Sequence, residues 1–274
     1  MLIKKSEIKK LSADIRRIID GQNIDLRDNR EGVLKILKND IHTLANIKNE
    51  QADSLGRERD VMAETLANIS HQLKTPLTSM MVMADLLENA PADKQTEFIA
   101  NIKTSLARME WLVSSLLKMA KLDAGAVEFS LMSVQADEVV SLAIEPLRIL
   151  LEIRKQIVDV SCNTEIFCDR KWTAEALSNV IKNASESSPD GGVISVESGM
   201  NPICRWICVT DGGEGIARNK ISSLFKRFEG SRSDRGYGIG LPLALAIMQG
   251  QNGDIEVDGG GNGKGATFAL KFYK

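Results

Sequence analysis

An apolar repeat in the first half of the chain restricts that half to long helices. Its residues are spaced mostly three, four or seven apart, as in a coiled-coil seam. They are Leu34, Leu37, Ile41 and Leu44 and, after a gap, Leu55, Met62, Leu66, Ile69 and Leu73. The eleven-residue step across the gap, from Leu44 to Leu55, breaks the heptad register and would locally unwind a supercoil. Charged residues fill the intervening positions, so the pattern fits a solvated single helix or a parallel dimeric coiled coil, and we favour the coiled coil.

A second long helix is predicted after a short loop. The first helical pattern ends at Leu87, and the stretch 88–94, with Pro91, contains helix breakers and a cap. Apolar residues at helical spacing then continue from 98 to 119, and Gly125 ends this half of the chain. Each helix has a broader apolar stripe than one hairpin can cover. We therefore predict that two hairpins pack as a dimeric four-helix bundle.

The second half of the chain mixes strand and helix patterns. Strands are predicted at 126–134, 157–162, 191–199, 204–213 and 265–273. Helices are predicted at 136–155, despite Pro146, and at 172–188 and 241–253. Because the two kinds of element do not alternate regularly, we expect an α/β sandwich with helices on one face of a mixed sheet.

Composition and charge exclude several classes of protein. The net charge of −2 over 274 residues does not indicate a nucleic-acid binder or a membrane-surface protein. No apolar run approaches the ~20 residues that span a bilayer. The cysteine spacing matches no zinc site, and we expect these residues to be reduced and mostly buried: Cys162, Cys168, Cys204 and Cys208. The lysine-rich start, residues 1–20, suggests a sequence that begins where a longer chain leaves a membrane.

Two stretches of the second half contain polar side chains suited to a nucleotide. Asn179 and Asn183 lie four residues apart, hence on one face of a helix, and an amide oxygen is a suitable ligand for Mg²⁺. Asp211 stands at a predicted strand end, before Gly213 and Gly215. A carboxylate there can accept a hydrogen bond from the amino group of adenine, and glycines let the backbone approach the ring.

A third stretch offers backbone groups for phosphate. Gly236, Gly238 and Gly240 precede Leu241 at the start of a predicted helix, where free N–H groups suit an anion. Each motif alone is weak, because paired asparagines are usually surface residues and a glycine triplet is usually a loop. The triplet also fits the dinucleotide fingerprint poorly, since no strand directly precedes it. The order of the motifs is therefore more informative than any one of them.

In this order the motifs resemble those of two-component sensor histidine kinases, over about residues 60–274. The similar segments are the H box at 70–77, the N box at 179–183, the first glycine box at 211–216, the F box at 225–228, the second glycine box at 236–241 and the last glycine segment at 265–268. Residues 29–40 faintly resemble the start of the second helix of a HAMP or signalling linker. The resemblance implies a HisKA helical hairpin that dimerises into a four-helix bundle, followed by a Bergerat-type (GHKL, HATPase_c) α/β sandwich. We divide the chain accordingly into a helical linker at 1–57, a dimerisation and phosphotransfer domain at 58–125, and a catalytic ATP-binding domain at 126–274.

The resemblance also implies an activity. The chain would be an ATP-dependent protein-histidine kinase that autophosphorylates His71 and passes the phosphoryl group to an aspartate of a response regulator. ATP and Mg²⁺ would be its cofactors, with Mg²⁺ at Asn183 and Asn179. The implied partners are a second copy of the chain and a receiver domain, and the implied location is the cytoplasmic portion of a protein anchored in the cell membrane. The other nucleotide-binding residues would be Asp211, Gly213, Gly215, Phe228, Arg232, Gly236, Gly238, Gly240, Leu241 and Thr267.

Two residues near the implied sites depart from the family pattern. Gln72 follows His71 where the family usually has Glu or Asp, and an amide can orient the ring but cannot act as a general base. We therefore expect autophosphorylation to be retained but slow. Glu186 stands where the family often has a basic residue, close to the expected triphosphate. Thr75 matches the position that orients water for dephosphorylation of the regulator, and Pro76 predicts a bend in the helix.

Two other functions fit parts of the pattern. A regulatory scaffold with weak kinase activity, which binds or dephosphorylates a regulator, is favoured by Gln72 and Glu186 but not by Asn183 and the glycine boxes. An ATPase of the gyrase or mismatch-repair type would need a catalytic glutamate early in the asparagine helix, and Glu175 occupies about that region. The H box on a dimerising hairpin favours the kinase.

Overall fold

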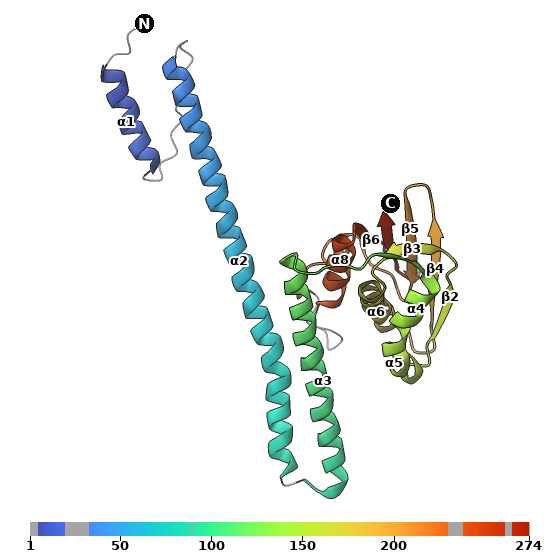
Figure 1. Cartoon of the computed structure of the whole chain (residues 1–274). Coiled ribbons are helices and arrows are strands. Elements are labelled where there is room, and N and C mark those ends of the chain that lie inside the picture. Colours follow the sequence, from blue (N-terminus) through green and yellow to red (C-terminus); the bar gives the residue numbers. More distant parts are fainter. Residues whose placement is uncertain (1–4, 20–32, 89, 230–237, 261–264, 274) are drawn as a thin grey trace. The chain divides into compact units, whose positions relative to one another are not determined.

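The computed structural model describes residues 5–19, 33–88, 90–229, 238–260 and 265–273. The chain divides into two compact units, Met1–Ala67 and Asn68–Lys274. The first unit contains α1 (Lys5–Ile19) and the beginning of α2 (Val33–Leu87) (Figure 1). None of the described helices is both long and apolar enough to cross a bilayer.

The predicted apolar seam lies along one continuous helix. α2 runs for 55 residues. Leu44, Leu55 and Met62 are each about two-thirds exposed, at 65%, 66% and 65%. Covering apolar side chains that are this exposed is favourable, because it removes apolar surface from water. The coiled coil itself needs a second chain, so the predicted dimer stays a prediction.

The predicted helical hairpin is confirmed. α2 ends at Leu87 and α3 (Ala92–Asp123) follows after the loop around Pro91. Gly125, just beyond α3, has φ +61°, which a glycine adopts without strain. Both helices keep exposed apolar residues: Leu77, Met81, Val82 and Leu86 on α2, and Ile99, Leu106, Val113 and Leu117 on α3. A second hairpin packed on this stripe would bury it.

A mixed five-stranded sheet forms the base of the second half, in the order β2-β4-β5-β7-β6. Its strands are β2 (Ile157–Ser161), β4 (Val193–Met200), β5 (Cys204–Thr210), β6 (Gly253–Asp258) and β7 (Thr267–Tyr273). β2 and β4 are parallel, and the other neighbours are antiparallel. A separate antiparallel pair joins β1 (Met132–Gln135) to β3 (Glu165–Cys168).

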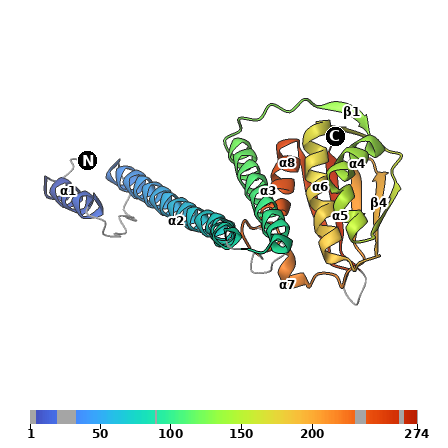
Figure 2. The same ribbon diagram turned by 90° about the horizontal axis from the view of Figure 1, so that it is seen from below.

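The helices cover one face of this sheet, as predicted (Figure 2). They are α4 (Ala136–Ile144), the 3-10 turn η1 (Glu145–Leu147), α5 (Arg148–Ile153), α6 (Arg170–Ser187) and α8 (Gly240–Gly250). The short helix α7 (Arg218–Ile221) has no buried residue. Alternate residues of β5 and β7 point into the core, and Ile207 and Phe268 are fully buried with Ile181 of α6 and Ile247 of α8. This arrangement confirms the α/β sandwich.

Several local predictions were wrong. The strand predicted at 126–134 begins only at Met132. The helix predicted at 136–155 is divided at Pro146 into α4, η1 and α5, because proline lacks the N–H that a helix interior needs. β3 and β6 were not predicted, since β3 has only four residues and β6 directly follows a glycine-rich helix end.

The four cysteines are free thiols, as expected. Cys168 is fully buried, whereas Cys162 and Cys208 are half-buried. Burial raises the pKa of all three thiols above its ordinary value. Because the thiolate is the reactive form, this shift keeps them unreactive near neutral pH.

We expect Cys168 to resist alkylation in the native protein at pH 8 and to react as fast as the other cysteines after unfolding. Its raised pKa in the folded state also has a consequence for stability. Because the folded state favours the protonated thiol, the protonated Cys168 contributes to the free energy of unfolding. This contribution is fully present below the ordinary thiol pKa of about 8.5 and is lost as the pH rises through the higher folded-state value. Pulse alkylation from pH 7 to 10, read by mass spectrometry, measures the rates, with half-buried Cys162 as internal reference. Equal native rates for Cys162 and Cys168 would contradict this expectation.

Candidate functional site

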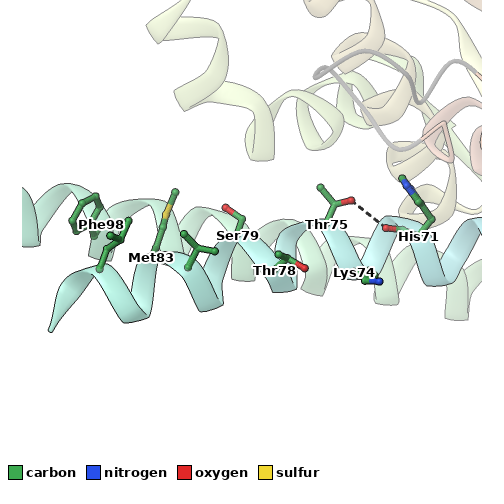
Figure 3. A pocket seen from close by; sticks show the side chains of 9 residues that line it. His71, Lys74, Thr75, Thr78, Ser79, Met83 and Phe98 are labelled. Atoms are coloured by element: carbon green, nitrogen blue, oxygen red, sulfur yellow. Dashed lines mark hydrogen bonds between the residues drawn. The ribbon is translucent and has the colours of Figure 1, made fainter.

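His71 is exposed on α2, at one end of an open hollow of roughly 600 Å³ (Figure 3). The polar end of the hollow is lined by Lys74, Thr75, Thr78 and Ser79, and the apolar end by Val82, Met83, Leu86 and Phe98. A macromolecule seated on this surface would meet the imidazole and several hydroxyls together.

The residues after the histidine differ in their exposure. Thr75 is exposed, and its Oγ1 donates to the carbonyl oxygen of His71 over 3.2 Å (Figure 3). Gln72 is half-buried. Pro76 is buried and α2 continues through it. Because proline has no N–H, the carbonyl of Gln72 lacks its usual helical donor. The predicted bend stays a prediction.

The two asparagines of α6 have different environments. Asn179 is only 8% exposed, and its Nδ2 donates to the carbonyl oxygen of Glu175 over 2.9 Å. Its Oδ1 faces the start of α8, where a Cβ on Gly240 would lie 3.1 Å away. Asn183, one turn further along α6, is half-buried and more accessible. Asn179 thus packs against the start of α8, and the more accessible Asn183 is better placed for a ligand.

Asp211 is held at the end of β5 by backbone groups. It is 5% exposed. Its Oδ1 accepts the N–H groups of Gly213 (2.8 Å) and Ala266 (3.1 Å). The N–H of Asp211 donates to the carbonyl oxygen of Ala266 over 3.0 Å. All of these side-chain bonds fall on Oδ1, which leaves Oδ2 to accept a hydrogen bond from a ligand.

The glycines near Asp211 are needed for close packing and unusual backbone angles. A Cβ on Gly213 would lie 2.6 Å from the carbonyl oxygen of Ser187. A Cβ on Gly265 would overlap the carbonyl oxygen of Asp211. Gly215 has φ +83°, in the left-handed region that favours glycine.

The F box and the second glycine box meet through the backbone. The N–H of Phe228 donates to the carbonyl oxygen of Gly238 over 2.9 Å. Phe228 is 8% exposed and has φ +63°, while Gly238 has φ +66°. A positive φ at a bulky residue is strained and persists only where the surroundings fix it. Leu241 is buried in the first turn of α8.

Two of the predicted nucleotide-binding residues are not described by the structure, and a third contacts its neighbouring strand. Arg232 and Gly236 lie outside the described residues. Thr267 has its Oγ1 2.9 Å from that of Thr210, on the neighbouring strand. The backbone of the preceding residue, Ala266, contacts Asp211, and the predicted nucleotide-binding role of Thr267 stays a prediction.

Sequence reasoning did not single out Ala266 or Ser188. Ser188 is 2% exposed, and its Oγ accepts the N–H of Gly212 over 2.9 Å. Ser188 is the C-cap of α6 and is followed by Pro189, a common sign of a helix end. That sign locates the residue but does not show what its side chain contacts.

Glu175 is engaged with α3. Its carboxylate forms a 2.8 Å ion pair with Lys118. The ion pair holds this carboxylate against a side chain of α3. This contact does not favour a gyrase-type role for Glu175 as general base.

Comparison with known proteins identifies the two domains. Residues 61–125 match the model of the His Kinase A (phospho-acceptor) domain. Residues 168–274 match that of the histidine kinase-, DNA gyrase B- and HSP90-like ATPases. The chain belongs to the sensor histidine kinases of two-component systems. Its domains are therefore those of a protein-histidine kinase.

Two curated sensor kinases show the extent of the similarity. The sensor-like histidine kinase SenX3 of Mycobacterium tuberculosis is 29% identical over 170 residues, which are 60% of this chain and 41% of SenX3. The histidine-protein kinase BaeS of Escherichia coli is 24% identical over 229 residues, 81% of this chain and 49% of BaeS. The chain thus spans half or less of the length of these relatives.

Solved histidine kinases have the same fold. The kinase AdeS of Acinetobacter baumannii superposes with a TM-score of 0.62 at 21% identity, over 74% of this chain and 97% of AdeS. The kinase ThkA, solved in complex with the response regulator protein TrrA, gives a TM-score of 0.64 at 17% identity, over 83% of this chain and 66% of ThkA. The predicted fold, a helical hairpin followed by a GHKL-type α/β sandwich, is confirmed.

Proposed function

We propose that this chain autophosphorylates His71 with ATP and passes the phosphoryl group to an aspartate of a response regulator. One combination of features in this sensor-kinase chain carries the proposal. His71 is exposed on the hairpin, and Asp211 is held so that one carboxylate oxygen can accept a hydrogen bond from the adenine base of ATP. We also propose the domain limits 1–57, 58–125 and 126–274.

The chemistry follows from these residues. A ring nitrogen of neutral His71 attacks the γ-phosphorus, the bond from that phosphorus to the β,γ-bridging oxygen breaks, and ADP leaves with the electron pair. The ring proton passes to solvent, because Gln72 cannot act as a base. Such a transfer depends mainly on positioning and charge stabilisation. Asp211 orients the base through Oδ2.

A magnesium ion fits this site only together with the nucleotide. Among the residues described, no group of three or more His, Cys, Asp and Glu side chains could hold a metal. Mg²⁺ binds readily to a few protein oxygens plus phosphate and water. The amide oxygen of Asn183, assisted by Asn179, suits a magnesium ion that is also bound by phosphate and water. When bound, the ion neutralises charge on the triphosphate.

The partners follow from the uncovered surfaces. The exposed stripe along α2 and α3 favours a second copy of this chain. The polar end of the hollow, beside His71, favours a receiver domain, and ThkA was solved in complex with the response regulator protein TrrA. We propose that the chain works in the cytoplasm as part of a membrane-anchored sensor, by analogy with the longer sensor kinases it resembles.

Incubation of the purified chain with γ-labelled ATP and Mg²⁺ tests the kinase. We expect acid-labile, base-stable label on the protein. Absence of label in a chain that binds ADP would instead favour a regulator phosphatase or scaffold. The exposed hydroxyl of Thr75, one turn from His71 in the same hollow, is the observation that supports this second function.

An Asp211→Asn change is expected to weaken ADP binding by about 10- to 100-fold, because a hydrogen bond to a charged group is worth about 1.5–3 kcal/mol. The amide keeps an acceptor for Gly213 and Ala266, so the fold should persist. Calorimetric titration measures the affinity, and thermal denaturation reports the fold. Unchanged affinity in the folded variant would contradict the role assigned to this carboxylate.

A further inference from the structure

The C-terminal end of α6 is held by side chains from the turn between α5 and β2. Arg154 donates from Nη1 to the carbonyl oxygen of Ser185 and from Nη2 to that of Ser188, the latter over 3.1 Å. Gln156, 8% exposed, donates from Nε2 to the same two carbonyls over 3.0 and 3.3 Å and accepts from Ser185 Oγ over 2.5 Å. The last carbonyls of a helix lack partners within the helix. These bonds therefore fix where α6 ends.

Ser188 connects this helix end to the segment after Asp211. Its Oγ donates to the carbonyl oxygen of Ala184 over 2.8 Å and accepts the N–H of Gly212 over 2.9 Å. A hydroxyl has one proton and two lone pairs, so both bonds form together. Gly212 is the next residue after Asp211. A buried side chain thus ties the end of the asparagine helix to the base-binding carboxylate.

The connection through Ser188 helps to hold the first glycine box, residues 211–216, in position. Glycines have more conformational freedom than other residues, so a segment rich in them needs outside contacts to stay in one place. Gly213 has a bond to Asp211 Oδ1 and lies against the carbonyl of Ser187, so its position also follows the end of α6. A looser segment would have to be ordered when a nucleotide binds, which costs affinity.

We propose that Ser188 is a positioning residue for the nucleotide base. Held by Arg154 and Gln156, it fixes Gly212 so that Asp211 presents Oδ2 to the 6-amino group of adenine. Guanine has a carbonyl oxygen at that position, so two hydrogen-bond acceptors would face each other with no proton between them. The inference rests on the proposed function, and it assigns adenine selectivity partly to a residue outside the asparagine and glycine motifs.

Calorimetric titration of the full chain with ADP and GDP tests this role. Ser188→Ala is expected to weaken ADP binding about tenfold, as the loss of one hydrogen bond predicts, and to change GDP binding little. The KM for ATP in autophosphorylation should rise while kcat at saturating ATP holds. Ser188→Thr keeps the hydroxyl and should restore the parental ratio of ADP affinity to GDP affinity, called the ADP to GDP ratio below. Ser187→Ala, an exposed neighbour with no side-chain hydrogen bond in the described part of the chain, is the matched control.

The outcomes separate the two proposals. A folded Ser188→Ala chain with the parental ADP to GDP ratio overturns the positioning role and leaves the kinase intact. If Ser188→Ala does not fold, Arg154→Met removes donors to the same carbonyls from a side chain that is 24% exposed. That variant should lower the ratio about threefold, in line with the loss of part of a hydrogen-bond network, and an unchanged ratio again overturns the role. A parent chain that binds neither nucleotide defeats the proposed function itself.

Discussion

A His71→Ala chain is expected to take up no acid-labile, base-stable label from γ-labelled ATP under conditions in which the parent is labelled. Alanine has no nitrogen to attack phosphorus, and the hydroxyls that line the hollow would give phosphate esters, which are not phosphoramidates. Because His71 is exposed on α2, its removal should leave the fold and ADP affinity unchanged. Gel autoradiography after acid and base treatment measures the label, and calorimetry with ADP measures the intact site.

The chain provides a matched control for this experiment. Its only other histidine, His42, lies on the same helix and is within 3.4 Å of Asn46 through Nε2. His42→Ala should therefore be labelled as the parent is. Residual base-stable label on His71→Ala, or its loss in His42→Ala alone, would place the phosphoryl group elsewhere.

The same assay measures the effect of Gln72. A Gln72→Glu chain is expected to be labelled faster than the parent, by no more than about 10²-fold, the lower end of what a general base contributes. Rates from a time course at saturating ATP give the comparison. An equal rate would mean that the ring loses its proton to water in both chains.

The order of helices and strands was largely predictable because it follows from periodicity. The end of α2 at Leu87 and the hairpin through Pro91 depend on local breakers that can be read from the sequence. β3 was missed because a strand of four residues has too little alternation to detect. The dimer contacts of the exposed stripe involve a second chain and stay predictions.

The residues of the candidate site could be predicted only where the type and spacing of the side chains indicate their role. Asn183 and Asp211 stand out by type and spacing. The hydrogen bonds of Ala266 and Ser188 to the same site do not, because they join residues 55 and 24 positions apart. Such contacts depend on the sheet register and on where α6 ends, and neither is encoded in a short motif.

A Gly265→Ala change is expected to destabilise the α/β domain by about 3 kcal/mol, at the upper end for overpacking. The new methyl group would overlap the carbonyl oxygen of Asp211 and approach its Oδ1 to 2.6 Å. Relief requires β7 to move away from the end of β5, which breaks the bond from Ala266 to Asp211. ADP affinity should fall with stability, since the base-binding carboxylate moves. Thermal denaturation should show a decrease in Tm of roughly 6–12 °C for a chain of this size.

Gly56→Ala separates this local effect from the general effect of replacing a glycine. Gly56 lies inside α2, and a Cβ there would meet nothing within 4 Å. Alanine should raise helix stability there by about 1 kcal/mol, because glycine is the poorer helix former. Opposite signs in the two variants would show that the space beside Asp211, and not the loss of a glycine, sets the cost at Gly265. A Gly265→Ala chain with the parental Tm and ADP affinity would mean that β7 can shift without disturbing Asp211, and the close packing at this strand end would then have no role in binding the base.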